Sequence, residues 1–237
     1  MPRWPEWRGL AAALALLLAL GSAAVLTRVK PVHILALGDS YTIGEGVTEE
    51  QRWPAQMAMR MATAQVQPTV QYIARTGWTT DELSAAIKEA EQARVLRSNY
   101  DLVSLQIGVN NQYRGRAADE YAGEFDGLLL RAIAFAGDKP AHVLALSIPD
   151  WGMTPFAHSA GVDKARVARQ IDRFNAVAAR ACKRHHVRFV DITDLTRSKE
   201  RASWLVEDGL HPSAAMYAAW AQRVAATLPA QRTQRSP

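Results

Sequence analysis

The sequence contains a single cysteine, Cys182, among its 237 residues. One cysteine cannot form an intramolecular disulfide, and it cannot supply the several thiolates of a cysteine-based zinc site. Its place on a helical pattern favours a packed thiol over a reactive one. The sequence also lacks a dinucleotide-binding Gly-x-Gly-x-x-Gly, a Gly-Lys-Ser/Thr phosphate loop, a His-Glu-x-x-His and a Gly-x-Ser-x-Gly elbow. We therefore expect chemistry that uses neither a cofactor nor a metal.

The chain also lacks a basic excess in its central part. The formal net charge is +5, but this excess comes from residues 1–30 and 229–237. Residues 31–228 contain 22 basic and 22 acidic residues. This balance indicates no basic groove, and we expect no nucleic-acid partner.

A long apolar run occurs only near the N-terminus, where residues 9–26 carry no charge. At a rise of ~1.5 Å per residue, a helix of this length reaches ~27 Å, enough to cross the hydrocarbon core of a bilayer. The basic residues on both sides and the small residues Ser22, Ala23 and Ala24 also fit a cleavable signal peptide. Both alternatives stay open. Either one predicts an exported protein, periplasmic, secreted or anchored to a membrane through residues 9–26, and the oligomeric state is not predicted.

From residue 31 onward, short apolar runs alternate with amphipathic helical patterns. Strands are expected at residues 32–37, 70–74, 102–107, 142–148 and 187–192, and helices at residues 53–65, 80–93, 117–136, 163–185 and 212–227. Thr79 or Thr80 is expected to cap the second helix, and Pro212 is expected in the first turn of the last. The repeated strand–helix order predicts a five-stranded parallel sheet in a three-layer, flavodoxin-like α/β/α sandwich. We expect one domain at residues 31–228, preceded by a leader at 1–30 and followed by a disordered tail at 229–237.

Four loops after the predicted strands carry polar residues suited to acyl transfer. They are Gly38-Asp39-Ser40-Tyr41, Arg75-Thr76-Gly77-Trp78, Gly108-Val109-Asn110-Asn111 and Asp208-Gly209-Leu210-His211-Pro212. Each loop alone is typical of an ordinary turn or helix cap. Parallel strands bring their C-terminal ends to one edge, so we expect the four loops to lie together. Acyl transfer needs a nucleophile, a base, a group that orients the base, and donors for an oxyanion, and the four loops contain all of these.

In their order, these blocks resemble the motifs of the SGNH hydrolases, also called the GDSL esterase/lipase family. The resemblance covers residues 31–228 and implies hydrolysis of small-molecule carboxylic esters. It makes Ser40 the nucleophile, His211 the general base and Asp208 the carboxylate that orients His211. It places the oxyanion hole at the backbone N–H groups of Ser40 and Gly77 and the side-chain amide of Asn110.

The chain departs from the family pattern at two places. Arg75 and Thr76 stand where many members have asparagine or another small residue ahead of the block-two glycine. Asn111 stands where the family usually has aspartate, and we interpret that position as a support for the catalytic residues. Asp39 is interpreted as a hydrogen-bonding residue of its loop.

The walls of the substrate pocket are predicted from large apolar residues near the four loops. Residues 148–156, which include Trp151 and Met153, are rich in large apolar groups and turn formers and are predicted to line the pocket. Trp78, next to Gly77, and Tyr113 are further candidates. A merely packed loop is the alternative for residues 148–156. Two other functions stay open for the whole domain. One is a carbohydrate O-deacetylase with the same triad, and the other is a non-catalytic flavodoxin-like module that holds an anion at residues 38–46.

Overall fold

The computed structural model describes residues 29–198 and 204–228. Within them, one sheet has the strand order β2-β1-β3-β4-β5, and each neighbouring pair is parallel. The strands are β1 Lys30–Gly38, β2 Val66–Ala74, β3 Leu102–Gln106, β4 Val143–Leu146 and β5 Arg188–Val190. The predicted five-stranded parallel sheet is confirmed.

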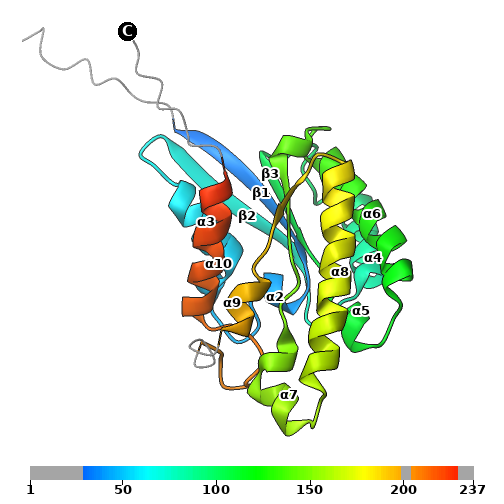
Figure 1. The fold of residues 1–237 in the computed structure, drawn as a ribbon. Helices are drawn as coiled ribbons and strands as arrows, with labels where there is room; N and C mark the ends of the chain where they lie inside the picture. The colour runs from blue at the N-terminus through cyan, green and yellow to red at the C-terminus, as the bar shows by residue number, and fades with distance from the viewer. Residues whose placement is uncertain (1–28, 199–203, 229–237) are drawn as a thin grey trace, which may run out of the picture.

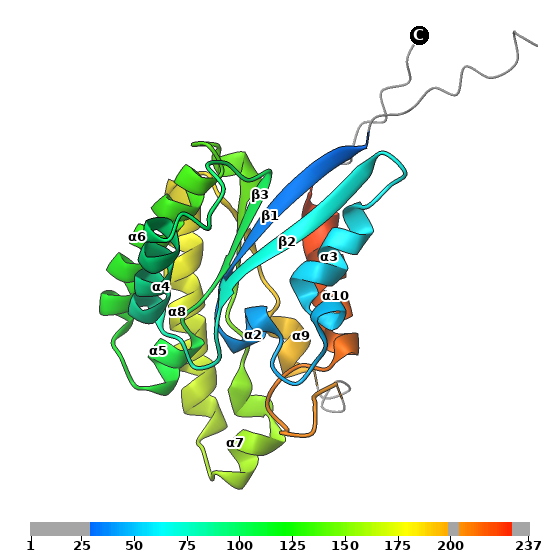
Figure 2. The ribbon, with the colours of Figure 1, turned by 180° about the vertical axis from the view of Figure 1, so that it is seen from behind.

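Helices cover both faces of this sheet (Figures 1 and 2). On one face, α3 Trp53–Met61 packs beside α10 Ala214–Thr227, and the other face is covered by α4 Thr80–Gln92, α6 Ala118–Phe135 and α8 Lys164–Arg184. Short helices occupy the connections: α2 Ser40–Ile43, α5 Val109–Tyr113, α7 Pro155–Ser159, α9 Thr193–Arg197, and the 3-10 turns η1 Glu49–Gln51, η2 Pro140–His142 and η3 Trp151–Met153. The α/β/α sandwich is the predicted one.

Strands β3 and β4 are buried along their whole length, and β1 is buried over most of it. Their continuous apolar sequences fit a parallel sheet that is covered on both faces. The thiol of Cys182 is buried in the same core, and this burial raises its pKa to about 12. Cys182 is therefore a protonated packing residue, in agreement with its sequence context.

Most element boundaries differ from the prediction by one or more residues, and three of these differences have a clear structural cause. Strand β2 begins four residues earlier than expected, because it lies at the edge of the sheet, where Pro68 needs no ladder partner for its nitrogen. Helix α3 ends at Met61 rather than residue 65, because Thr63 and Val66 form a tight bridge that starts β2. Pro212 lies before α10 and not in its first turn, since it pairs with Leu205 and leaves Ser213 as the N-cap.

The strand order positions the loops that carry the candidate site. The chain leaves β1 toward β2 at one edge and then crosses over β1 to reach β3 on its other side. The loops that follow β1 and β3 therefore diverge at the C-terminal end of the sheet. Open α/β sheets bind their ligands at such switch points.

Candidate active site

Ser40 is the first residue of α2 and lies two residues after the end of strand β1 at Gly38. The carboxylate of Asp39 caps this short helix, with Oδ1 accepting a hydrogen bond from the N–H of Tyr41 at 3.0 Å. A glycine is required at position 38, because a Cβ atom there would lie 2.5 Å from the carbonyl oxygen of Gln106. The turn therefore holds Ser40 at the C-terminal end of the sheet, where the β1 backbone packs closely against that of β3.

Asp39 is fully buried beneath this turn, and its Oδ2 atom has no hydrogen-bond partner among the described residues. Burial raises the pKa of Asp39 to about 7, although its bond to the N–H of Tyr41 acts in the opposite direction. The interpretation of Asp39 as a hydrogen-bonding loop residue agrees with its capping role. The raised pKa could not be predicted from the sequence, because it results from the burial of Asp39 in the folded protein.

Asp208 and His211 form a compact turn before α10. Asp208 Oδ2 lies 2.5 Å from His211 Nδ1, while Asp208 Oδ1 accepts hydrogen bonds from the N–H groups of Leu210 and His211 at 2.8 and 2.9 Å. Partial burial raises the pKa of Asp208, but the bonds from the imidazole and the backbone outweigh it and hold the pKa below its usual value. An ionised carboxylate thus fixes the ring through Nδ1 and leaves Nε2 for other partners.

The three residues predicted to form the oxyanion hole, Ser40, Gly77 and Asn110, line one cavity. The backbone N–H groups of Ser40 and Gly77 donate no hydrogen bond to any described residue. The side-chain amide of Asn110 donates to the carbonyl of Trp78 at 2.8 Å, which orients the amide and leaves its second hydrogen unused. Gly77 has φ +85°, a conformation that favours glycine. His211 lines the same cavity.

Side chains from other loops hold the loop after β2, and sequence reasoning did not identify these contacts. The hydroxyl of Thr76 donates to Glu45, and Arg114 Nη2 donates to the carbonyl of Gly77 at 2.7 Å. Asn111 binds Thr80 twice, accepting from its N–H at 3.1 Å and donating to its hydroxyl at 2.6 Å. Asn111 therefore supports the site from below, as interpreted from the sequence.

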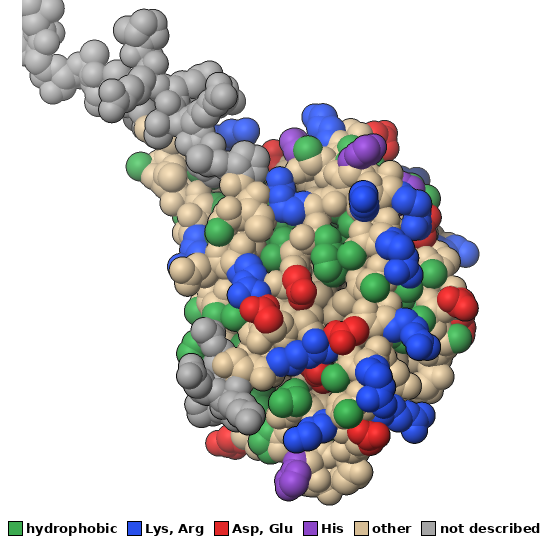
Figure 3. All heavy atoms as spheres, viewed as in Figure 1, with side chains coloured by type: hydrophobic (Ala, Val, Ile, Leu, Met, Phe, Trp, Pro, Cys, Tyr) green, Lys and Arg blue, Asp and Glu red, His purple; other side chains and the backbone are tan. Residues whose placement is uncertain are grey.

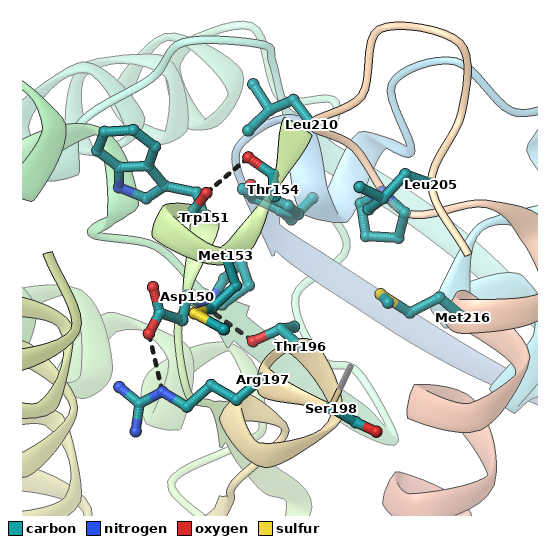
Figure 4. A pocket seen from close by; sticks show the side chains of 13 residues that line it. Asp150, Trp151, Met153, Thr154, Thr196, Arg197, Ser198, Leu205, Leu210 and Met216 are labelled. Carbon is teal, nitrogen blue, oxygen red and sulfur yellow. Dashed lines mark hydrogen bonds and ion pairs between the residues drawn. The ribbon is translucent and has the colours of Figure 1, made fainter. Parts of the chain in front are cut away.

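The predicted pocket residues separate into three groups. Tyr113 and Trp151 line the Ser40 cavity, with their ring centroids 5.1 Å apart in an edge-to-face arrangement. Met153 lines a neighbouring cavity instead (Figure 4). The side chain of Trp78 lines neither cavity and packs against the core. Phe156, the last residue of the segment at 148–156 that was predicted to line the pocket, also lines the Ser40 cavity.

The part of the chain that the structure describes contains neither a candidate metal-binding group nor a candidate membrane-spanning helix. No group of three or more His, Cys, Asp or Glu side chains in this part of the chain could hold a metal ion. In the same part, no helix combines the length and apolar character that a membrane span requires. The apolar run at residues 9–26 lies outside the described residues.

Residues 36–219 match the model of the GDSL-like Lipase/Acylhydrolase family. This match covers most of the chain, which therefore belongs to this family and is a carboxylic ester hydrolase. No curated protein matches the sequence.

Several solved structures share the fold at low sequence identity. A variant of the acetyl xylan esterase Axe2 from Geobacillus stearothermophilus has a TM-score of 0.63 at 18% identity, covering 84% of this chain and 95% of that one. Phospholipase A1 from Streptomyces albidoflavus NA297 has a TM-score of 0.60 at 19% identity, covering 82% and 98%. A lipase/acylhydrolase from Enterococcus faecalis has a TM-score of 0.60 at 16% identity, covering 82% and 94%.

Proposed function

We propose that the protein hydrolyses carboxylic esters through a triad of Ser40, His211 and Asp208 and a covalent acyl-enzyme. The observation that carries this proposal is the Asp208–His211 hydrogen bond at a cavity that Ser40 also lines. The carboxylate holds the imidazole in the tautomer with hydrogen on Nδ1, so that Nε2 is free to accept a proton. Among the described residues no hydrogen bond joins Ser40 to His211, and such contacts often tighten only when substrate is bound.

In the proposed reaction, Ser40 Oγ attacks the ester carbonyl carbon while His211 Nε2 takes the hydroxyl proton. The N–H groups of Ser40 and Gly77 and the amide of Asn110 stabilise the oxyanion that forms. When the tetrahedral intermediate collapses, the bond to the alcohol oxygen breaks and His211 returns the proton to the alcohol. A water molecule, deprotonated by His211, then attacks the acyl carbon; the bond to Ser40 Oγ breaks, His211 returns the proton to Oγ, and the acid leaves.

A fluorophosphonate probe tests the nucleophile directly. We expect one adduct on Ser40 in the folded protein, located by mass spectrometry of its peptides. Ser40→Ala and His211→Ala should each abolish hydrolysis of p-nitrophenyl acetate while the circular dichroism spectrum stays that of the parent. Parental activity in either variant, or labelling at another residue, would refute the triad.

A second candidate function is the O-deacetylation of a carbohydrate with the same three residues. The aromatic rings of Tyr113, Trp151 and Phe156 at the cavity favour it, since such rings offer apolar faces on which a sugar can stack. One structural neighbour, Axe2, is an acetyl xylan esterase. A panel of acetylated sugars, lysophospholipids, acyl-thioesters and aryl esters separates the two functions by comparison of kcat/KM.

We further propose that the protein acts outside the cytoplasm, as its apolar residues 9–26 suggest. A fusion to alkaline phosphatase, which is active only after export, tests this location.

A further inference from the structure

A second cavity, shown in Figure 4, shares wall residues with the one that Ser40 lines. It lies between η3, α9 and the start of α10, and apolar side chains form most of its wall, among them Met153, Leu205 and Met216. Tyr41, Trp151 and Leu210 line both cavities. These three residues therefore form a wall that the two spaces share.

Most polar side chains in the wall of this second cavity already have hydrogen-bond partners within the protein. Asp150 accepts from the N–H of Gly152 at 3.0 Å and from Arg197 Nε at 2.8 Å. Arg197 also donates to Asp172 at 2.7 Å, so two carboxylates offset its charge. The hydroxyls of Thr154 and Thr196 each donate to a backbone carbonyl, at 2.6 and 2.7 Å. A charged or strongly polar ligand would find few free partners here.

An apolar ligand suits this wall better. Methionine side chains are flexible and polarisable, so Met153 and Met216 can adjust to chains of different length. Burial of each methylene group of such a chain is favourable by roughly the same increment. The wall therefore matches an unbranched hydrocarbon chain, which needs contact area and no hydrogen bonds.

Trp151 is the fixed part of the boundary between the cavities. Its indole Nε1 donates to Gln112 Oε1 at 2.7 Å, and Gln112 Nε2 donates to Gln170 Oε1 at 2.9 Å. These bonds hold the ring in place while it lines both cavities. A chain that outgrows the space beside Ser40 thus meets the second cavity at Trp151.

We propose that this second cavity binds the distal hydrocarbon chain of an ester whose carbonyl lies at Ser40. The proposal rests on the proposed function, and it gives the substrate class as esters with a medium-length alkyl chain on either the acyl or the alcohol side. Tyr41, Trp151 and Leu210 then act as the rim over which the chain passes.

The test introduces a charge into the second cavity at Met153. This side chain is 38% exposed, so that the core can tolerate Met153→Asp, and Met59→Asp on α3 is a matched control at an exposed methionine outside both cavities. The measured quantity is the ratio of kcat/KM for p-nitrophenyl octanoate to that for p-nitrophenyl acetate. We expect this ratio to fall about tenfold or more in Met153→Asp and to stay at the parental value in Met59→Asp.

A second series places the chain on the alcohol, comparing octyl acetate with ethyl acetate. The series whose ratio falls identifies the half of the ester that enters the cavity. Ser198→Phe, which fills the cavity from its half-buried rim, should lower the same ratio and does not depend on the Met153 variant folding.

Three outcomes separate this proposal from the proposed function. If both ratios stay at the parental value in Met153→Asp and Ser198→Phe, another segment of the chain or solvent fills the cavity, and the proposal is overturned. An equal loss for short and long esters also overturns it, because it indicates a structural defect. If the parent protein neither hydrolyses any of these esters nor labels at Ser40, the proposed function itself fails.

Discussion

Three consecutive residues after β2 are each held by a side chain from another loop. Thr76 donates to Glu45, the carbonyl of Gly77 accepts from Arg114, and the carbonyl of Trp78 accepts from Asn110. The Gly77 N–H belongs to the peptide group between Thr76 and Gly77, and these bonds anchor the chain on both sides of that group, at the Thr76 side chain and at the Gly77 carbonyl. Preorganised donors of this kind stabilise an oxyanion without reorganisation during the reaction. The residues around the loop are thus as relevant to the proposed oxyanion hole as its donors.

Replacement of Arg114 tests this support, because Arg114 donates to the carbonyl of Gly77. We expect Arg114→Met to lower kcat for p-nitrophenyl acetate by about 3- to 10-fold at nearly constant KM, since the Gly77 donor acts mainly in the transition state. The range is modest because the Arg114 side chain is 45% exposed. Arg116→Met is the matched control, because Arg116 pairs with Asp81 and does not contact Gly77. Equal kinetic losses in the two variants would contradict a positioning role for Arg114.

Asp39 gives a prediction about pH and stability. Burial raises its pKa in the folded protein from 3.8 to about 7, so the folded state holds this proton more tightly than the unfolded state does. The contribution of the protonated Asp39 to the free energy of unfolding is complete below pH ~4 and is lost as the pH rises through ~7. Asp39→Asn keeps the acceptor for the N–H of Tyr41 and removes the titration.

The expected result is a pH-dependent difference between the parent and Asp39→Asn. From pH 5 to pH 8, the free energy of unfolding of the parent should fall relative to the variant by roughly 1–3 kcal/mol. Urea denaturation of both proteins at the two pH values measures this change in the free energy of unfolding. The contributions of other titrating groups are the same in both proteins and cancel in the difference. A difference that does not change with pH would show that Asp39 titrates near its ordinary pKa.

The residues that carry the proposed chemistry could be predicted from the sequence, but those that support them could not. Ser40, Gly77, Asn110, Asp208 and His211 belong to short blocks whose order is itself a signal. Glu45 and Arg114 have no such signal. They contact the loop after β2 only because the strand order brings separate loops to one edge of the sheet.

At the scale of elements, long periodic segments were predicted more accurately than short ones. Helix α8 was expected at residues 163–185 and is Lys164–Arg184, with Asp163 as its N-cap. Helices α2 and α5 were not predicted, because four or five residues are too few to show a helical period. Both hold proposed catalytic residues, so the predicted site lacked the local geometry that these helices supply.

Alanine substitutions at two glycines distinguish the effect of backbone crowding on stability from the effect of helix propensity. A Cβ atom at position 38 would meet the Gln106 carbonyl at 2.5 Å, whereas a Cβ atom at position 127 in α6 would meet nothing within 4 Å. Gly38→Ala should therefore lower the free energy of unfolding by about 1–3 kcal/mol and reduce activity, since α2 must shift. Gly127→Ala, at an exposed helical position, should raise it by about 0.5–1 kcal/mol and leave activity unchanged.

Thermal and urea unfolding of both variants, with p-nitrophenyl acetate turnover, test this pair. If Gly38→Ala were as stable and active as the parent, the turn that carries Ser40 would have more freedom than its contacts allow.

On the scale of the whole molecule, the balanced charge of residues 31–228 is an average over an uneven distribution. Helix α8 alone contains seven basic residues and one acidic residue. In Figure 3, Lys and Arg side chains gather on the side of the surface that α8 forms, and acidic side chains are interspersed nearer the middle. A count over the sequence cannot reveal this arrangement, because it depends on which helix faces solvent. The absence of a nucleic-acid partner stays a prediction.

The described ends of the chain lie far from the proposed active site. Strand β1 runs from Lys30 at the end of the sheet where the chain enters to Gly38 beside Ser40, a span of ~26 Å for a strand of this length. Leu228, at the end of α10, lies at the same end of the sheet as Lys30 (Figure 1). Near the start of the described chain, the N–H of Lys30 donates to the carbonyl of Gln65 at 2.7 Å. This bond joins two residues of the proposed domain or its border and does not involve residues 1–28.

Removal of residues 1–28 should therefore leave catalysis intact. We expect the shortened protein to hydrolyse p-nitrophenyl acetate with kcat/KM within about twofold of the full chain, because the walls of both cavities and the supporting hydrogen bonds lie within residues 39–216. The full chain is measured in mild detergent, and the shortened protein is measured with and without the same detergent. A tenfold loss in the shortened protein under matched conditions would show that the N-terminal residues contribute to the active site, and the domain proposed for residues 31–228 would then be incomplete.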